Sequence, residues 1–344
     1  MKSGFQILKI IKKKQSIYPK EFTPSVEIRI PISATKKYLR MIHYFLESLK
    51  QFGGPIGSSA KCVILVGRDE PFRDLTKEFT WISNYDIKFL WTDEDLFKKY
   101  NYHGTSFSRL KIKSEADIII LADADILVAN DFDQAILDSF INQKLLGCIA
   151  HVSPFIGLDS KNTSSKIWWR RIFDEAGICL PLFNNIHTGW GLMNKDEEHR
   201  RCPNYYNYGF IISPRKYIEQ MSQDFLSELE AIDHVLKTHF KSQIANTLSF
   251  ERNNIPCGTL PINYNFPLHV SDEKIRALNL DPKGENSAEH VKIFHYLGNG
   301  RFNKKIFETS KSLENILEYE NLNEAETVFQ RKLRFIHKRI ESKQ

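Results

Sequence analysis

Two aspartates, Asp123 and Asp125, directly follow the most hydrophobic run of the chain, Ile118–Ala122. Ligands of open α/β sheets bind beyond the carboxyl ends of the strands, so acids at this position lie where chemistry is expected. Side chains two residues apart on extended backbone point to the same side, and both carboxylates can therefore converge on one hard cation such as Mg²⁺ or Mn²⁺. The ion would also remove the repulsion between the two acids. The spacing predicts a metal site.

An Asp-x-Asp pair by itself has other interpretations. One aspartate can cap the following helix while the other is solvated. A phosphatase of the haloacid-dehalogenase type also places an aspartate after a hydrophobic strand, but near the start of its domain and with Thr or Val where this chain has Leu127. A sugar-phosphate nucleotidyltransferase normally carries a glycine-rich loop near its first strand, and residues 26–35 contain no glycine. The last two classes are therefore disfavoured.

Short β-rich runs alternate with helical patterns along the chain. The expected strands are Val26–Ile32, Lys61–Val66, Asp86–Trp91, Ile118–Ala122 and Leu146–Val152, with further regular segments at Phe210–Ser213 and Phe250–Pro261. The expected helices are Tyr38–Gln51, Asp131–Gln143 and Pro214–Phe240. An unbroken apolar strand such as Ile118–Ala122 is typical of a parallel strand covered on both faces. The pattern predicts an α/β fold with a Rossmann-type, mostly parallel central sheet and helices on both faces.

The segment Ser153–Tyr206 lacks clear periodicity and is rich in aromatic residues, among them Trp168, Trp169, Phe173, Phe183 and Trp190. A segment of this length without clear elements is more often functional than idle in a compact domain. Aromatic faces stack well on sugar rings, and the segment, with His187-Thr188-Gly189-Trp190-Gly191, is therefore a candidate acceptor-binding region. The alternative is a satellite hydrophobic cluster that packs against the sheet.

The net charge of +6 is concentrated at the chain ends. The first 20 residues carry six lysines and no acid, and residues 329–344 carry six basic residues and one acidic residue. Without a basic stripe on a folded face, nucleic acid is not an expected partner. The five cysteines lack paired spacing, and neither a signal peptide nor a membrane-spanning run is evident. We expect reduced thiols and a cytoplasmic location.

We divide the chain into a basic N-terminal segment (1–25), a catalytic domain (26–305) and a helical basic C-terminal extension (306–344). The extension is expected to be helical over Ser312–Lys343, with Ser312 as its N-cap. Its apolar residues Phe329, Leu333, Ile336 and Ile340 form one stripe beside a basic face. Two interpretations stand: the stripe lies on the inner face of an anionic membrane, or it packs on the catalytic domain.

Several segments together resemble a known family. Phe107-Ser108-Arg109-Leu110, followed by ADIIILADADILVANDF, resembles the core of the GT-A glycosyltransferases, specifically family 8, the retaining enzymes related to glycogenin and bacterial galactosyltransferases. Three later segments keep the order of the family's motifs: Tyr206-Asn207-Tyr208-Gly209-Phe210, then Gln243 with Leu260-Pro261-Ile262-Asn263-Tyr264-Asn265, then His295-Tyr296-Leu297-Gly298-Asn299-Gly300-Arg301. The resemblance covers roughly residues 26–305.

The resemblance implies a role for each matched residue. Its metal ligands would be Asp123, Asp125 and His295. Its residues toward the nucleotide sugar would be Arg109, Asn207, Gly209, Gly298 and Arg301. Gln243 would position the reacting groups, since its amide is a poor nucleophile. The chain departs from the family in having Ser242 for an acid and Arg301 for a lysine, although arginine still offers a charged fork to phosphate.

The implied activity is metal-dependent transfer of a sugar from a nucleoside diphosphate sugar, with retention and with a UDP-hexose as the favoured donor. An imidazole ligand favours Mn²⁺ over Mg²⁺. The acceptor would be a saccharide or a lipid-linked sugar. A non-catalytic nucleotide-sugar-binding protein remains the alternative.

Overall fold

The computed structural model describes residues 23–155, 158, 165–187, 200–268, 287–296 and 301–343. Its main sheet has the strand order β10-β6-β9-β4-β1-β2-β3. These strands are β1 (Val26–Ile32), β2 (Lys61–Val66), β3 (Ile87–Trp91), β4 (Ile118–Ala122), β6 (Leu145–Ile149), β9 (Tyr206–Pro214) and β10 (Cys257–Thr259). All neighbours pair in parallel except β9, which is antiparallel to β4 and β6. The predicted α/β fold with a mostly parallel sheet is confirmed.

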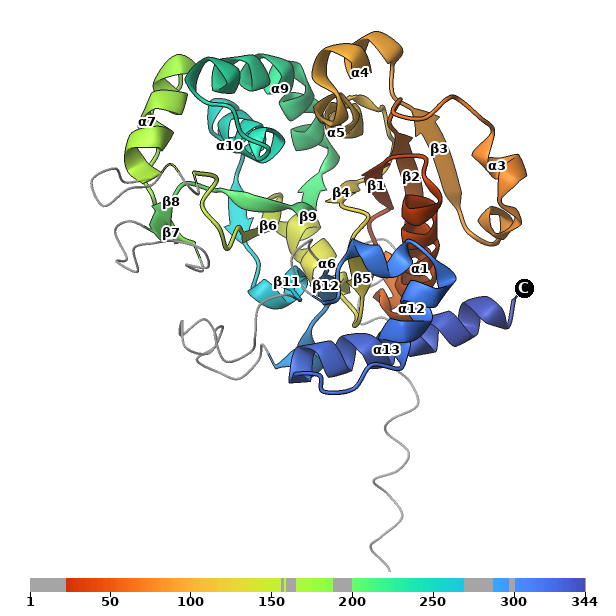
Figure 1. The fold of residues 1–344 in the computed structure, drawn as a ribbon. Coiled ribbons are helices and arrows are strands. Elements are labelled where there is room, and N and C mark those ends of the chain that lie inside the picture. Colours follow the sequence, from red (N-terminus) through yellow and green to blue (C-terminus); the bar gives the residue numbers. More distant parts are fainter. Residues whose placement is uncertain are drawn as a thin grey trace, which may run out of the picture.

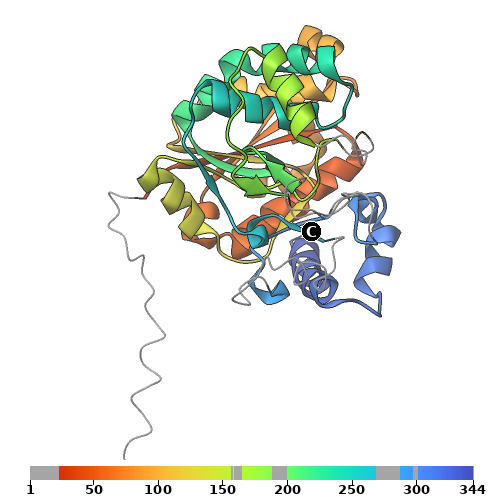
Figure 2. The ribbon, with the colours of Figure 1, turned by 90° about the vertical axis from the view of Figure 1, so that its left-hand side faces the viewer.

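The central strand β4 separates two hydrophobic cores. Ile118, Ile120 and Ala122 belong to one core, and Ile119 and Leu121 belong to the other, as the alternation of side chains along a strand requires. Figures 1 and 2 show the sheet between α1 on one side and the green helices α9 and α10 on the other. Burial on both faces explains the unbroken apolar sequence of β4.

Helices cover both faces of the sheet. They are α1 (Lys36–Phe52), α2 (Gly54–Gly57), α3 (Leu75–Glu78), α4 (Glu94–Tyr100), α5 (Tyr102–Lys111), α6 (Asp133–Asn142), α7 (Ser165–Glu175), α9 (Arg215–Val235), α10 (Lys241–Arg252), α12 (Ser310–Leu317) and α13 (Glu324–Glu341). Short 3-10 turns are η3 (Thr80–Asn84), η4 (Ile262–Tyr264), η5 (Ala288–His290) and η6 (Lys304–Phe307). None of the helices in the described ranges has the length and apolar content that crossing a bilayer requires.

Three sequence-based expectations about the elements are wrong. The first residues of the segment Phe250–Pro261 belong to α10, which also carries Gln243. The C-terminal helix is interrupted, because Asn323 starts α13 with a capping box that includes Glu326. Thr309, not Ser312, caps α12, and its side chain accepts a hydrogen bond from the Ser312 N–H.

The apolar stripe of α13 faces the protein and not a membrane. Phe329, Leu333 and Ile336 are fully buried and Ile340 is 4% exposed, all within the same core as α1. The alternative, that the stripe packs on the catalytic domain, is therefore the correct interpretation. A bilayer cannot reach this stripe while α13 is docked. The N-terminal segment up to residue 22 lies outside the described residues.

The described part of Ser153–Tyr206 contains α7 and a small ribbon of β7 (Asn185–Ile186) and β8 (Arg201–Cys202). Trp169 and Phe173 are fully buried in the second core. For these two side chains the alternative interpretation, a hydrophobic cluster packed against the sheet, is the correct one. Trp190 and Gly191 lie outside the described residues.

Candidate active site

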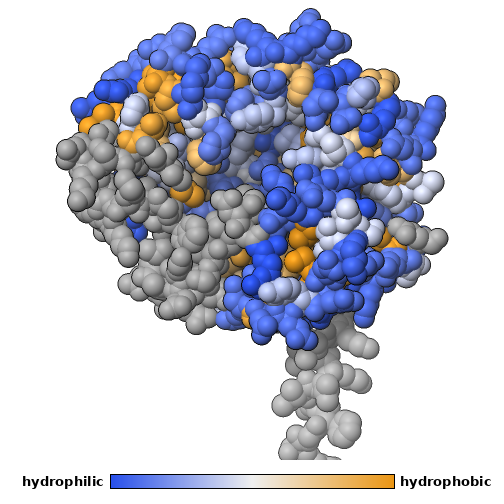
Figure 3. Space-filling model, viewed as in Figure 1, coloured by the Kyte–Doolittle hydropathy of each residue, from blue (hydrophilic) through white to orange (hydrophobic). Residues whose placement is uncertain are grey.

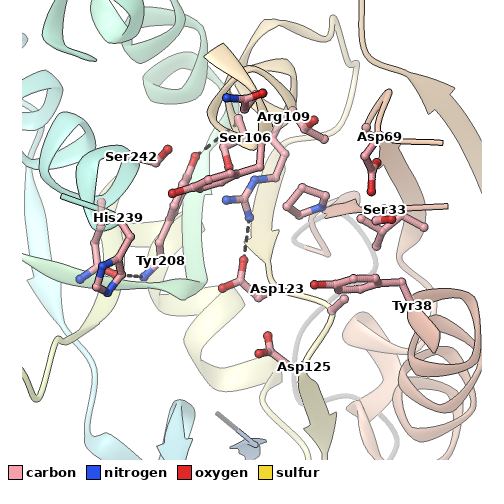
Figure 4. A pocket seen from close by; sticks show the side chains of 18 of the residues that line it. Ser33, Tyr38, Asp69, Ser106, Arg109, Asp123, Asp125, Tyr208, His239 and Ser242 are labelled. Carbon is pink, nitrogen blue, oxygen red and sulfur yellow. Dashed lines mark hydrogen bonds and ion pairs between the residues drawn. The ribbon is translucent and has the colours of Figure 1, made fainter. Parts of the chain in front are cut away.

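Asp123 and Asp125 lie in the turn between β4 and β5 (Ile126–Val128). The Asp123 N–H donates to the carbonyl of Gly209 on β9 (3.0 Å), and the Asp125 carbonyl accepts from the Tyr296 N–H (3.0 Å). The turn is thus held from both sides by neighbouring backbone. Both carboxyl groups line the same cavity (Figure 4).

A second, three-stranded sheet brings His295 to these acids. Its strand order is β11-β12-β5, with β11 at Phe266–Pro267 and β12 at Ile293–His295. β12 is antiparallel to β5, and His295 pairs with Ile126, the residue after Asp125. As a result, one possible ligand atom from each of Asp123, Asp125 and His295 lies within 4.8 Å of the others.

A chain of hydrogen bonds fixes the tautomer of His295. The Gly209 N–H donates to Asn207 Oδ1 (2.8 Å), which identifies that atom as the amide oxygen. Asn207 Oδ1 also accepts from Asn265 Nδ2 (3.0 Å), so the Asn265 oxygen is the atom that faces His295 Nδ1 (2.9 Å). Nδ1 must therefore carry the proton, and Nε2 keeps its lone pair.

The freed Nε2 faces the acids. It is buried and has no hydrogen-bond partner among the described residues, although it lies 3.4 Å from Asp125 Oδ1. A buried acceptor without a partner is costly, whereas a metal ligand with its other ring nitrogen bonded to an oxygen is a common arrangement. The donor set of two carboxylates and one neutral imidazole thus fits a divalent ion.

Gly209 permits the close approach of the His295 ring. A Cβ added at Gly209 would lie 2.4 Å from His295 Cε1 and 2.9 Å from Asn207 Oδ1. Neither atom can give way without breaking the Asn207–Asn265–His295 chain. The resemblance assigns Gly209 to the nucleotide sugar; the structure places it against the metal-site histidine.

Arg109 of α5 forms part of the cavity wall. Its guanidinium is buried, donates to the Ala122 carbonyl (3.0 Å) and lies 3.4 Å from Asp123 Oδ1 (Figure 4). The same group stacks over the Tyr208 ring at 3.9 Å. Arg109 therefore balances the charge of Asp123 and fixes the cavity wall between β4 and β9.

Gln243 of α10 also lines the cavity. Its Oε1 accepts from the Tyr208 N–H (3.2 Å), which holds the side chain against β9. The adjacent Ser242, which stands where the family has an acid, bonds the buried His103 Nδ1 at 2.6 Å. Burial lowers the pKa of His103 to about 4, so this pair is uncharged near neutrality.

Arg301 and Lys304, two basic residues close together in the sequence, lie in different surroundings. Arg301 is exposed, stacks over Tyr319 at 4.2 Å and lies 3.8 Å from Glu326, within the C-terminal extension. Lys304 instead lines the cavity, with Nζ 3.4 Å from Asp125 Oδ2. The motif assigns Arg301 to the diphosphate, whereas Lys304 is the cation beside the acids. Gly298 lies outside the described residues.

The cavity has a volume of about 710 Å³, which is within the usual range for a small-molecule site. It extends from Asp125 and Lys304 past Tyr38 to Ser33 and Asp69 at the ends of β1 and β2. The face in Figure 3 is mostly hydrophilic and is hollowed near its centre. The cavity thus has two acids at the end of β4, each with a basic residue beside it, and a third acid, Asp69, in its lining near the end of β2.

The two aspartates have opposite pKa shifts. Burial raises the pKa of Asp123, and the neighbouring Asp125 adds to this while Arg109 opposes it. Burial also acts to raise the pKa of Asp125, and the charges of Lys304 and of a protonated His295 oppose it; with His295 neutral, as its hydrogen bonds require, Lys304 is the group that lowers the pKa. Of the two carboxyl groups, Asp125 is therefore the one that ionises more readily.

Sequence reasoning missed Lys304 and Asn265. Asn265 was within a recognised motif but without a role, and the structure shows that it orients His295. Lys304 lies three residues beyond the position of the motif lysine, and nothing in the sequence distinguishes it from the adjacent Lys305. Asn265 reaches the site from between η4 and β11, and Lys304 reaches it from η6. Local sequence patterns do not reveal how these segments pack.

The sheet topology and the acids at the end of β4 define a GT-A-like glycosyltransferase fold that resembles family 8. No protein-family model and no curated protein matches the sequence. Among similar solved structures is the galactosyltransferase LgtC in complex with donor and acceptor sugar analogues, at 12% identity and a TM-score of 0.51, covering 82% of this chain and 94% of that one. The bifunctional glycosyltransferase WbbM is similar at 15% identity and a TM-score of 0.51, covering 92% of this chain and 53% of that one.

Proposed function

We propose that this protein is a metal-dependent glycosyltransferase that uses a nucleoside diphosphate sugar. The main observation in support is that Asp123, Asp125 and His295 converge at the carboxyl edge of a GT-A-like sheet. The buried Nε2 of His295 has no hydrogen-bond partner among the described residues. The capping interpretation of the Asp pair does not account for a buried histidine whose lone pair is aimed at the carboxylates.

Each residue of the site has a part in this proposal. Asp123, Asp125 and His295 would hold the ion, which when bound neutralises charge on the donor diphosphate. Lys304, whose ammonium lies 3.4 Å from Asp125 Oδ2, would add a positive charge toward the same phosphates. Arg109 keeps Asp123 in place, and Gln243 braces the wall on which the donor sugar would lie.

The finer assignments rest on the resemblance to family 8. They are a UDP-hexose donor, retention at the anomeric carbon, and Mn²⁺ in preference to Mg²⁺. The imidazole ligand supports the choice of ion, because Mn²⁺ accepts nitrogen ligands more readily than Mg²⁺ does. A front-face reaction, in which the leaving phosphate helps to deprotonate the acceptor, needs no protein nucleophile. The neutral Ser242–His103 pair lies where the family has an acid, so the donor sugar itself must be found by screening.

A donor screen tests the proposal. The protein is incubated with Mn²⁺, Mg²⁺ or chelator and with a panel of nucleotide sugars, and release of nucleoside diphosphate is followed. We expect release from at least one uridine donor, dependent on the ion and absent in Asp125→Asn. Release from none of the donors, together with tight binding of UDP, would favour the non-catalytic binding protein.

A further inference from the structure

Asp125 has a basic group on each side of its carboxylate. His295 Nε2 lies 3.4 Å from Oδ1, and Lys304 Nζ lies 3.4 Å from Oδ2. The Lys304 ammonium therefore lies next to the carboxylate oxygens that a divalent ion would use as ligands. A lysine ammonium and a doubly charged ion repel each other strongly at such separations. Lys304 must give way when an ion binds.

The backbone that carries Lys304 is fixed, but its side chain can move. Phe307 at the end of η6 is fully buried against Tyr44 and Tyr296, with ring centroids 5.0 and 5.6 Å apart. The Phe307 carbonyl accepts from Arg40 Nη1 at 2.8 Å. The Lys304 side chain is 38% exposed and ends on a flexible four-carbon stem. Its ammonium can shift within the cavity without any change in the turn.

The charges in contact with the two aspartates at the end of β4 favour simultaneous binding of an ion and a diphosphate. Asp123 and Asp125 are balanced by Arg109 and Lys304, while His295 is neutral in the tautomer fixed by Asn265. A divalent ion alone would leave the site with two excess positive charges. The two negative charges of a bound diphosphate restore the balance. Lys304 thus opposes binding of the ion alone and favours binding of the ion together with a diphosphate.

We propose, on the basis of the function proposed above, that Lys304 couples the two ligands of the site. Its ammonium holds Asp125 until a metal ion displaces it, and it then moves onto the donor diphosphate. By linkage, the ion strengthens nucleotide binding by the same factor by which the nucleotide strengthens ion binding. Lys304, not Arg301, is the residue that sets this factor.

Titration of Mn²⁺, followed by the electron paramagnetic resonance of the free ion, measures the coupling. Mn²⁺ affinity is determined without and with saturating UDP, corrected for Mn²⁺ held by free UDP. In Lys304→Met we expect Mn²⁺ alone to bind more tightly by about fivefold or more, and the strengthening by UDP to shrink by a similar factor. Lys305→Met, on the same turn and exposed, and Arg301→Met should both behave like the wild type.

The outcomes separate this inference from the proposed function. Unchanged constants in Lys304→Met, or weaker binding of Mn²⁺ alone, would overturn the inference while leaving a metal-dependent nucleotide site intact. A wild-type protein that binds neither Mn²⁺ nor UDP would overturn both. Asp125→Asn must lose the measured Mn²⁺ binding, which places the signal at this site. Thermal melting of each variant shows that the fold is retained.

Discussion

Asp123 and Asp125 belong to one short turn at the end of β4, whereas His295 and Lys304 reach the same cavity from β12 and η6 near the end of the described chain. The turn is held by backbone bonds to Gly209 of the central sheet and to Tyr296, which directly follows β12. The β12–η6 side is held by side chains packed against α1 and α13. One half of the site thus depends on the sheet, and the other depends on the C-terminal extension.

The difference shows how an extension far from the cavity can control it. Phe329 of α13 is fully buried and contacts Phe294, Tyr296 and Phe302, with ring centroids between 5.4 and 5.7 Å apart. These residues flank His295 on both sides along the chain. The basic extension therefore supports the histidine half of the site, and the two halves should respond differently to substitution.

The largest effect is expected from Asp125→Asn on the sheet-held half. An amide cannot supply the charge that holds the ion, so ion-dependent donor turnover should fall by about 1000-fold or more. Asp125 is near the surface of the cavity and its backbone bonds remain, so the melting temperature should change little. Turnover assays with varied Mn²⁺ measure the effect. Activity that persists with its ion dependence unchanged would remove Asp125 from the site.

Phe329→Ala should loosen the other half. Removing a buried phenylalanine costs about 3–5 kcal/mol of unfolding free energy, measured by urea denaturation. Below the transition, Mn²⁺ binding should also weaken, because β12 loses its support. Phe335→Ala on the same helix, where the ring is 45% exposed, is the control and should cost less than about 1 kcal/mol. A large stability loss with unchanged Mn²⁺ affinity would contradict the division into two halves.

Asn265→Ala tests whether the histidine half depends on a fixed tautomer. Loss of such an orienting partner typically lowers metal affinity about 10–100-fold. The fold should be retained, because the strand bonds of β11 and β12 do not involve this side chain. Calorimetric titration with Mn²⁺ gives the affinity, and Asn263→Ala in the same segment is the matched control. Equal affinities in the two variants would show that Asn265 does not orient His295.

The smallest expected effect is a loss of folding stability at acid pH, at the place on α1 where Glu47 pairs with Lys343. Burial lowers the pKa of His43 on α1 to about 4 from 6.5, while Glu47, which pairs with Lys343, opposes the shift. The unfolded chain takes up this proton first, so stability is full above about pH 6.5 and falls as the pH drops toward 4.

Urea unfolding of the wild type near neutrality and at about pH 5 measures this loss, to which His43 should contribute about 1–2 kcal/mol. His43→Gln should remove that share of the pH dependence, although the substitution itself lowers stability at both pH values. An identical pH dependence in the two proteins would exclude His43 as a source.

The sequence alone determined the sheet and the carboxylate half of the site. The apolar run of β4 is buried on both faces, and the acids that follow it needed only the two-residue period of a strand to share a side. The motif order also led to His295 before its neighbours were known. The sheet and the shared side of the two aspartates could be inferred because they depend on local backbone geometry, whereas His295 was implied only by the order of the family's motifs.

Only the tertiary structure shows which of two basic residues, Arg301 or Lys304, faces Asp125. It also shows that Asn265 accepts from His295 Nδ1 and so fixes the tautomer of that histidine. It also decided that the stripe of α13 is core and not membrane surface. An amphipathic pattern specifies that one face will be buried but not what buries it. A turn of η6 likewise directs side chains according to how Phe307 packs, and that packing involves residues far away in the sequence.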